Sequence, residues 1–200
     1  MCRVCLRCKA GKTTLLAALL GEVRPAERIV CVEDAAELAP SHPHVVRMVA
    51  RAPNVEGVGE VTVRQLVRQA LRMRPDRLVV GEVRGAEVVD LLTALNTGHD
   101  GGAGTIHANS PAEVPARLEA LAALGGMSRS ALHSQLGAAV QIVLHVHRGA
   151  DGKRRLREIA VVVPDASGRV RVAPAWTSNG DKHSERARLD ELLASRTENS

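Results

Sequence analysis

A motif suited to phosphate chemistry stands near the start of the chain. It has one glycine, one lysine and two hydroxyl side chains, and it opens a predicted helix: Gly11, Lys12, Thr13 and Thr14. These residues form the second half of the pattern G-x-x-x-x-G-K-[ST], in which backbone N–H groups surround phosphates at a helix N-terminus. The lysine of that pattern reaches the β- and γ-oxygens, and its hydroxyl ligates Mg²⁺. The motif therefore predicts a phosphate-binding loop.

The first half of this loop departs from the pattern. Its first glycine is expected at position 6, where the sequence has Leu6, and larger residues fill positions 7–10. Glycines are normally needed there, because the backbone folds tightly and approaches the phosphates. Residues 1–10 thus form an aberrant start, which we expect to be disordered or artefactual. Three cysteines (Cys2, Cys5 and Cys8) have the spacing of part of a metal or iron–sulfur site, but a fourth nearby ligand is missing.

Acidic side chains follow two predicted strands of a parallel sheet. Residues 28–32 and 78–80 are short runs rich in β-branched residues; Glu33, Asp34 and Glu37 follow the first, and Glu82 and Arg84 follow the second. Open α/β sheets bind ligands at these strand ends. Glu82 would suit the Mg²⁺ of a nucleotide, and the other carboxylates could orient an attacking water or hold a metal's water shell. Solvated acidic turns are the alternative.

Two arginines and two histidines extend this candidate set. Arg47 and Arg51 lie on one face of a predicted strand over residues 44–51, where they could clamp a γ-phosphate or be ordinary exposed side chains. His99 and His107 lie on either side of a glycine-rich turn that allows a ligand close to the backbone. We expect these histidines to face or sense a phosphate.

The elements that must position these residues alternate between strands and helices. Helices are predicted at residues 11–20, 62–71, 86–95, 114–124 and 128–139, with capping boxes from Thr62 to Gln65 and from Ser110 to Glu113. Residues 141–147, 155–163 and 170–174 alternate apolar and polar side chains and predict a small antiparallel meander. We expect an α/β domain over residues 11–175 and a polar tail over residues 176–200 with one short helix near 189–193.

Composition narrows the classes of function. Two hundred residues with 45% hydrophobic content suffice for one core, and the absence of Phe and Tyr nearly excludes nucleic-acid binding by aromatic stacking. A formal charge of +5 permits contact with phosphates or acidic lipids. No apolar run is long enough to span a bilayer and no signal peptide is present, so the chain is expected in the cytoplasm. The four cysteines do not resemble a disulfide framework.

On these motifs the chain resembles the C-terminal, RecA-like half of the ATPases that energise type II secretion, type IV pili and type IV secretion. It is most similar to the CpaF/TadA branch, which assembles Flp (tight-adherence) pili. Residues 28–40 (RIVCVEDAAELAP) match the Asp box of that family, residues 74–87 (RPDRLVVGEVRGAE) its atypical Walker B motif, and residues 97–111 (TGHDGGAGTIHANSP) its His box. The resemblance runs from about residue 11 to about residue 163.

The resemblance implies a RecA-like P-loop NTPase domain that uses ATP and Mg²⁺. Nucleotide binding would fall to Gly11, Lys12, Thr13, Thr14 and His99, and the metal to Thr13, Glu82 and Asp34. It implies that Glu82 is the Walker B acid, that Glu37 with Glu33 and Asp34 prepares the attacking water, and that His99 and His107 read the γ-phosphate. Arg47 and Arg51 match arginines that act within or between subunits.

The same resemblance implies a partnership and a place in the cell. Members of the family are hexameric rings at the cytoplasmic face of an inner-membrane complex, so we expect a homo-hexamer with secretion or pilus platform proteins as partners. The expected function is an ATP-hydrolysing motor of secretion or Flp pilus assembly. A catalytically disabled, N-terminally truncated fragment of such a motor is the alternative. A RecA-like nucleic-acid motor is disfavoured by the missing aromatic residues, so no direct nucleic-acid binding is expected.

Overall fold

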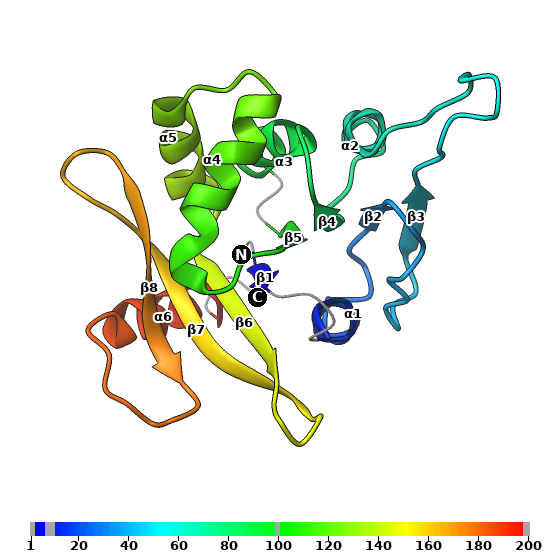
Figure 1. The fold of residues 1–200 in the computed structure, drawn as a ribbon. Helices are drawn as coiled ribbons and strands as arrows, with labels where there is room; N and C mark the ends of the chain where they lie inside the picture. Colours follow the sequence, from blue (N-terminus) through cyan, green and yellow to red (C-terminus); the bar gives the residue numbers. More distant parts are fainter. Residues whose placement is uncertain (1–2, 7–10, 99–100, 198–200) are drawn as a thin grey trace.

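The computed structural model describes residues 3–6, 11–98 and 101–197 and is built on one eight-stranded sheet (Figure 1). The strands are β1 (Arg3–Leu6), β2 (Ile29–Glu33), β3 (Val45–Val49), β4 (Arg77–Val83), β5 (Ala103–Ile106), β6 (Ile142–Arg148), β7 (Arg154–Pro164) and β8 (Val170–Thr177). The helices are α1 (Lys12–Gly21), α2 (Val63–Leu71), α3 (Glu87–Leu95), α4 (Val114–Leu124), α5 (Arg129–Ala139) and α6 (Arg186–Thr197), with a 3₁₀ turn η1 (Pro111–Glu113) before α4.

The order of strands in the sheet is β3-β2-β4-β5-β1-β6-β7-β8. The first six of these run parallel, whereas β7 and β8 are antiparallel to their neighbours. The predicted α/β class, with a mainly parallel sheet and a C-terminal antiparallel meander, is confirmed. The meander is not a separate unit, since β6 pairs in parallel with β1 and carries the sheet on into β7 and β8.

Helices cover both faces of the sheet because its central strands are buried on both sides. In β2, Val30 and Val32 pack into the larger core with α2, α3, α4 and α5, while Ile29 and Cys31 pack with Leu16 and Leu20 of α1. Alternate residues of a strand point to opposite faces, so a continuous apolar run supplies two cores. Helix α6 covers the α1 side further along the sheet, where Leu189 is buried against Ala175 and Ile142.

Of the two predicted capping boxes, the one at the start of α2 forms in the structure and the one before α4 does not. Thr62 accepts a hydrogen bond from the backbone N–H of Gln65, and the Gln65 side chain accepts one from the backbone N–H of Thr62, so α2 begins as predicted. The predicted box from Ser110 to Glu113 was wrong. The Ser110 hydroxyl accepts no capping bond from the backbone and donates to the Glu113 carboxylate at 3.4 Å, while Asn109 also donates to that carboxylate, and a 3₁₀ turn precedes α4.

Residues 3–6 form a central strand, contrary to the disordered start expected for this segment. Strand β1 pairs on both sides, with Arg3 opposite Ala103 of β5 and Ile142 of β6. A run of four residues is too short for its side-chain pattern to identify a strand. The predicted cysteine spacing involves side chains outside the described part of the chain.

Residues predicted as a polar tail contribute to the packed structure. Strand β8 continues to Thr177, and α6 extends well beyond the short helix expected near residues 189–193. At the opposite edge of the sheet, residues 51–61 project from the end of β3 as an arm, closed by a bridge between Arg51 and Val61 (Figure 1). None of the described helices combines the length and the apolar character that a membrane span requires.

Candidate functional site

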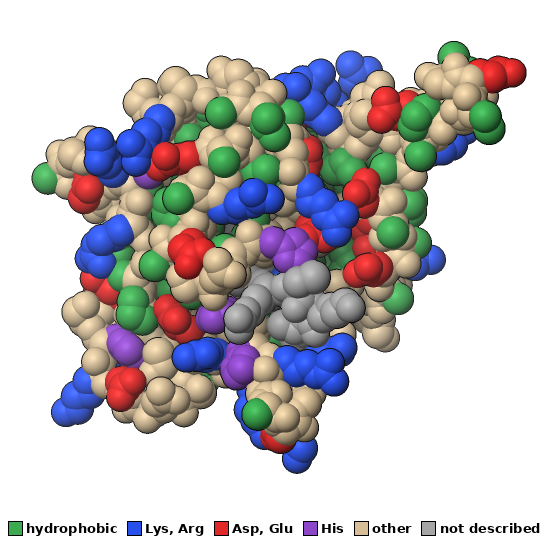
Figure 2. All heavy atoms as spheres, viewed as in Figure 1, with side chains coloured by type: hydrophobic (Ala, Val, Ile, Leu, Met, Phe, Trp, Pro, Cys, Tyr) green, Lys and Arg blue, Asp and Glu red, His purple; other side chains and the backbone are tan. Residues whose placement is uncertain are grey.

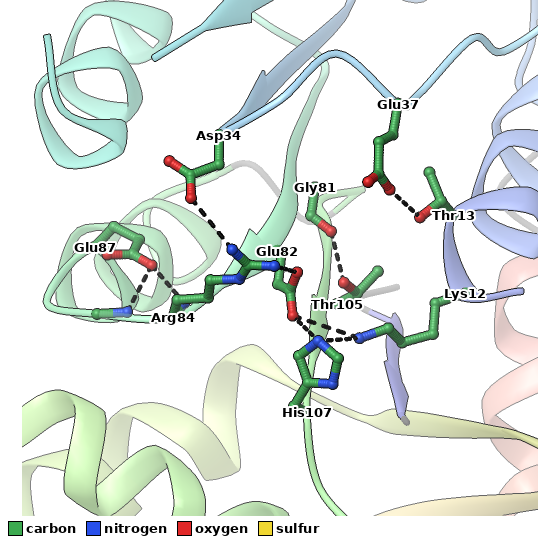
Figure 3. A network of polar contacts seen from close by, with 11 residues as sticks. Lys12, Thr13, Asp34, Glu37, Gly81, Glu82, Arg84, Glu87, Thr105 and His107 are labelled. Carbon is green, nitrogen blue, oxygen red and sulfur yellow. Dashed lines mark hydrogen bonds and ion pairs between the residues drawn. The ribbon is translucent and has the colours of Figure 1, made fainter. Parts of the chain in front are cut away.

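A pocket of about 720 Å³ opens at the carboxyl ends of the parallel strands. Its lining comes from the start of α1, the turn after β2, the end of β4 and the residues after β5: Gly11, Lys12, Thr13, Thr14, Ala17, Glu33, Asp34, Ala35, Glu37, Ala39, Gly81, Glu82, Arg84, Thr105 and His107, with Arg154 from β7. Figure 3 shows most of the polar members converging. The sheet order places β4 between β2 and β5. The acidic residues after β2 and at the end of β4 and the histidine after β5 therefore meet beside the N-terminus of α1.

Lys12 is the first residue of α1 and the most buried cation of the pocket. Gly11 precedes it in the left-handed conformation, with φ of 90°, which favours glycine. The Lys12 side chain is only 8% exposed, and its Nζ lies 3.1 Å from Nε2 of His107 and 3.6 Å from Oε1 of Glu82. A buried ammonium beside a helix N-terminus is a favourable position for an anion.

Glu82 connects the two cationic side chains at the centre of the pocket. Strand β4 shifts its register against β5 between Val80 and Val83, and an irregularity of this kind re-aims side chains. Glu82 Oε1 faces Lys12 and His107, while Oε2 accepts from Arg84 at 2.5 Å. Burial alone would raise the pKa of Glu82, but the bond from Arg84 and the charge of Lys12 outweigh it and lower the pKa. The carboxylate is therefore ionised at neutral pH.

Position 81 of β4 has no room for a side chain, because the side chain of Glu33 occupies that space. A Cβ at position 81 would lie 2.7 Å from Cγ of Glu33. Glu33 is 3% exposed, and its Oε1 accepts from the backbone N–H groups of Glu37 and Leu38 at 3.1 and 2.8 Å. Its Oε2 is buried and has no hydrogen-bond partner among the described residues. Glu33 thus shapes the turn after β2 from inside the pocket.

That turn presents two further carboxylates to the pocket. Oε2 of Glu37 accepts a hydrogen bond of 3.1 Å from the Thr13 hydroxyl, and Oδ2 of Asp34 lies 3.5 Å from NH1 of Arg84. Thr13 is therefore close to a carboxylate at the first turn of α1, and Arg84 joins the β2 turn to the end of β4. Both carboxylates are solvent-exposed, so they keep access to water.

His107 follows β5 and can take one of two partners. A neutral Nε2 accepts from Lys12, whereas the Nε2–H tautomer donates to Glu82, and the two bonds exclude each other. Burial and the charge of Lys12 lower the pKa of His107, although Glu82 opposes the shift. The imidazole is therefore neutral at neutral pH, and its hydrogen bond can change when a ligand takes Lys12.

Not every predicted residue reaches this pocket. NH1 of Arg47 donates to the Leu38 carbonyl at 3.2 Å, and Nε of Arg51 donates to the Gly59 carbonyl at 2.8 Å in the arm. Neither side chain lines the pocket, because β3 is the edge strand and β2 separates it from β4. Thr14 and Gly11 line the pocket as predicted, and His99 lies outside the described residues.

Several side chains at the site were absent from the predicted set. The buried Glu87 carboxylate accepts from the backbone N–H groups of Arg84 and Gly85, and the Thr105 hydroxyl donates to the Gly81 carbonyl at 2.6 Å. Arg84, which the sequence placed at this strand end, binds Glu82 and Asp34. Arg154 enters from the meander, far away in sequence. The acid at Glu87, three residues beyond Arg84 at the start of a helix, was a usable signal. No local pattern indicates Arg154.

The charges of the pocket fit a polyphosphate together with a divalent cation. Four carboxylates (Glu33, Asp34, Glu37, Glu82) face three basic side chains (Lys12, Arg84, Arg154), so a polyphosphate alone would meet excess negative charge. No cluster of three or more His, Cys, Asp or Glu ligands occurs within the described residues. Mg²⁺ suits such a site, since it keeps its waters and takes one or two protein oxygens plus phosphates. Thr13, Glu82 and Asp34, the residues predicted to hold the metal, all line this pocket.

A mainly parallel sheet whose strand ends gather a lysine at a helix N-terminus, a carboxylate and a histidine is typical of α/β proteins that bind phosphates at this edge. The chain belongs to the type II/IV secretion system protein family, whose model matches residues 9–198.

Relatives of the chain carry names from conjugation and secretion. A Mycobacterium tuberculosis protein named provisionally for conjugal transfer is 69% identical over 193 residues, which cover 96% of this chain and 54% of the relative. The conjugal transfer protein TrbB of Rhizobium radiobacter is 36% identical over 75% of this chain and 44% of its own length. The type IV secretion system protein PtlH of Bordetella pertussis is 37% identical over 73% and 45%. The chain spans about half the length of these relatives.

Solved structures of secretion ATPases share the fold. The VirB11 ATPase of the Brucella suis type IV secretion system, in complex with sulphate, aligns with a TM-score of 0.68 and 31% identity over 79% of this chain and 47% of that one. The pilus retraction motor PilT with bound ADP aligns with a TM-score of 0.58 and 22% identity over 86% and 46%, which shows the fold alone. The expected RecA-like class is thereby confirmed.

Proposed function

We propose that this chain is the nucleotide-binding part of an ATP-hydrolysing motor that drives secretion or pilus assembly. The convergence of Lys12, Glu82 and His107 on one pocket carries this proposal. Membership of the type II/IV secretion system family and the 31% identity to the VirB11 ATPase support it. Because the chain spans about half of its relatives, the activity proposed is that of the whole protein.

Each residue of the pocket has a proposed task. Lys12 and the backbone N–H groups of α1, with Gly11 and Thr14, bind the phosphates, and Thr13, Glu82 and Asp34 hold Mg²⁺, which neutralises phosphate charge when bound. Glu37, placed by Glu33, orients a water toward the γ-phosphorus. The water's oxygen bonds to phosphorus as the bond to the β–γ bridging oxygen breaks, leaving ADP and phosphate. His107 senses the γ-phosphate through Lys12, and His99 is proposed to assist.

We also propose a branch of the family, an oligomeric state and a place in the cell for this chain. The Asp box, Walker B and His box motifs favour the CpaF/TadA branch, in which the motor assembles Flp pili as a homo-hexamer at the cytoplasmic face of the membrane. Inner-membrane platform proteins are then its partners. The names of its relatives connect them to conjugal transfer and secretion, and a nucleic-acid motor stays the weaker alternative because the sequence has no Phe or Tyr and one Trp for stacking on bases.

The positions of Arg47 and Arg51 favour a role at the nucleotide site of a neighbouring subunit. Both lie at the β3 edge of the sheet, away from the pocket of their own chain. We propose that one or both reach the nucleotide of a neighbour in the ring. Mixing Lys12→Ala with Arg51→Ala subunits then restores part of the ATPase activity that each lacks, whereas mixing Lys12→Ala with Glu82→Gln subunits, both altered in one pocket, restores none.

Steady-state ATP hydrolysis tests the enzyme directly. The chain is compared with Lys12→Ala, with Glu82→Gln, and with a version whose residues 6–10 are rebuilt as a glycine-rich loop. The proposal predicts turnover by the chain above the Lys12→Ala blank. Turnover only after rebuilding identifies a disabled fragment with competent C-terminal motifs, and inactivity of all versions contradicts the ATPase proposal.

A further inference from the structure

The hairpin between β6 and β7 brings a basic side chain to the phosphate pocket from outside the nucleotide-binding motifs. Arg154, the first residue of β7, lies against the helix start: a Cβ on Gly11 would stand 2.6 Å from its Cδ and 3.3 Å from its Nε. The side chain lines the same pocket as Lys12 and Glu82. Figure 2 shows Lys and Arg side chains gathered on the projecting end of the molecule that Figure 1 identifies as this hairpin.

The other arginines at the hairpin and in the pocket already have partners. Arg155 forms a two-point ion pair with Asp151 at 2.6 and 3.0 Å, and Arg148 donates to the Gly152 carbonyl at 3.0 Å. Arg84 is bound to Glu82 and Asp34. The side chain of Arg154, by contrast, has no hydrogen bond or ion pair with any residue that the structure describes.

The position of Arg154 suits an anion better than solvent alone. Its side chain adds positive charge at the N-terminus of α1, where the helix dipole is positive and where Lys12 also lies. The carboxylates of the pocket pair with Lys12 and Arg84, and the described residues give the Arg154 guanidinium no carboxylate partner, so a phosphate oxygen would supply one. A guanidinium has a planar fork of donors that matches two phosphate oxygens, which an ammonium cannot reproduce.

We propose that Arg154 binds phosphate oxygens of the nucleotide, so that the β6–β7 hairpin forms one wall of the site. This inference rests on the proposed function, since it takes the polyphosphate of a nucleotide as the ligand. It also connects nucleotide occupancy to β6, which pairs with β1, the strand immediately before the phosphate-binding loop. The meander thereby becomes a part of the molecule that responds to nucleotide.

The test is the affinity of the chain for Mg²⁺–ATP, measured by isothermal titration calorimetry. Arg154→Gln is expected to weaken binding about tenfold, as the loss of a charge-assisted hydrogen bond does. Arg154→Lys keeps the charge without the fork and should recover part of the loss. Arg155→Gln removes the same charge from the same hairpin outside the pocket, and it should change affinity by less than about twofold.

The outcomes separate this inference from the proposed function. Wild-type binding that Arg154→Gln leaves unchanged, or that Arg155→Gln weakens as much, overturns the role of Arg154 while the nucleotide site stands. Absence of binding by the wild-type chain, with a melting temperature equal to that of Lys12→Ala in ATP, overturns both. Unchanged melting temperatures of the variants without nucleotide verify that each one folds.

Discussion

The carboxylate of Glu82 is held between charges that a nucleotide would have to rearrange. One oxygen faces Lys12 and His107 and the other accepts from Arg84. When phosphate oxygens take Lys12, Glu82 is released from that ammonium and becomes available to a cation. In the structure, the Glu82 carboxylate pairs with Lys12 at the position where a phosphate oxygen would bind. The positive charges of Arg84 and Lys12 lower the pKa of Glu82 and keep it ionised.

Gly81 is predicted to tolerate no side chain. In Gly81→Ala the new Cβ would contact Glu33 Cγ at 2.7 Å, so Glu33 or the strand must shift, at a cost of about 1–3 kcal/mol in the free energy of unfolding. Gly104→Ala is the control, because its nearest neighbours, at 3.4 Å, are far enough away for ordinary contact. Urea unfolding measures both, and equal stability of the two variants would contradict the packing of Glu33 on Gly81.

The His107 imidazole is predicted to make stability depend on pH. Its pKa in the folded chain lies below the ordinary histidine value of 6.5, so the unfolded chain binds the proton more readily. The contribution of neutral His107 to the free energy of unfolding is fully present above pH 6.5 and is lost as the pH falls toward the lower pKa of the folded chain. Between about pH 7 and pH 5 the wild type should lose more stability than His107→Asn, as measured by urea unfolding. An identical loss in both proteins would contradict the lowered pKa.

At the scale of elements, helix starts decide how the site segments are held. Helix α2 has a complete capping box and connects to α3 through Asp90, which accepts from Arg64 and Arg68 at 2.7 Å each. Helix α3 follows the β4 end, where Glu87 caps the turn that carries Arg84. These contacts fix the end of β4 in relation to the helices beneath the pocket.

Two matched substitutions test the capping assignments. Thr62→Ala removes the hydroxyl that accepts from the backbone N–H of Gln65 in a formed capping box, and it should lower the free energy of unfolding by about 1 kcal/mol. Ser110→Ala removes the same hydroxyl from a position that makes no capping bond, so it should cost less than about 0.5 kcal/mol. Chemical unfolding gives both values. A larger loss at Ser110 than at Thr62 would contradict the two helix starts described.

Sequence patterns predicted elements whose signals are local and missed those whose determinants are distant. The apolar runs of β2 and β4 identified strands that are buried on both faces of the sheet. The alternation of apolar and polar residues in β6 to β8 identified strands that are buried mainly on one face. Strand β1 is too short to show a pattern, and Arg154 reaches the pocket only because the sheet places β6 beside β1. Ser110 has the residues of a capping box, but the Asn109 side chain competes for Glu113.

Across the whole molecule, one sheet connects the pocket at the strand ends to the C-terminal region. Helix α6 packs on this sheet through Leu189, which is 3% exposed beside Ala175. The segment after β8 is therefore part of the fold despite its polar composition. The arm at residues 51–61 lies at the other edge, where Val55 and Val58 are exposed.

Helix α6 is predicted to contribute to global stability. Leu189→Ala should destabilise the chain by about 2–4 kcal/mol, because it removes a buried side chain and leaves a cavity. Leu193→Ala, at a position that is 48% exposed in the same helix, should cost less than about 1 kcal/mol. Thermal unfolding followed by circular dichroism compares them. If Leu189→Ala melts like the wild type, α6 does not pack on the sheet as described.

The binding of Mg²⁺–ATP to the chain and to Lys12→Ala is the most direct measurement of the central claim, that this pocket is a nucleotide site. Isothermal titration calorimetry with and without Mg²⁺ separates the contribution of the cation. We predict saturable binding by the chain, weaker binding without Mg²⁺, and a loss of at least about tenfold in affinity with Lys12→Ala, since a buried charge pair to phosphate is removed. Equal affinity of the two proteins, or no binding by either, would contradict it.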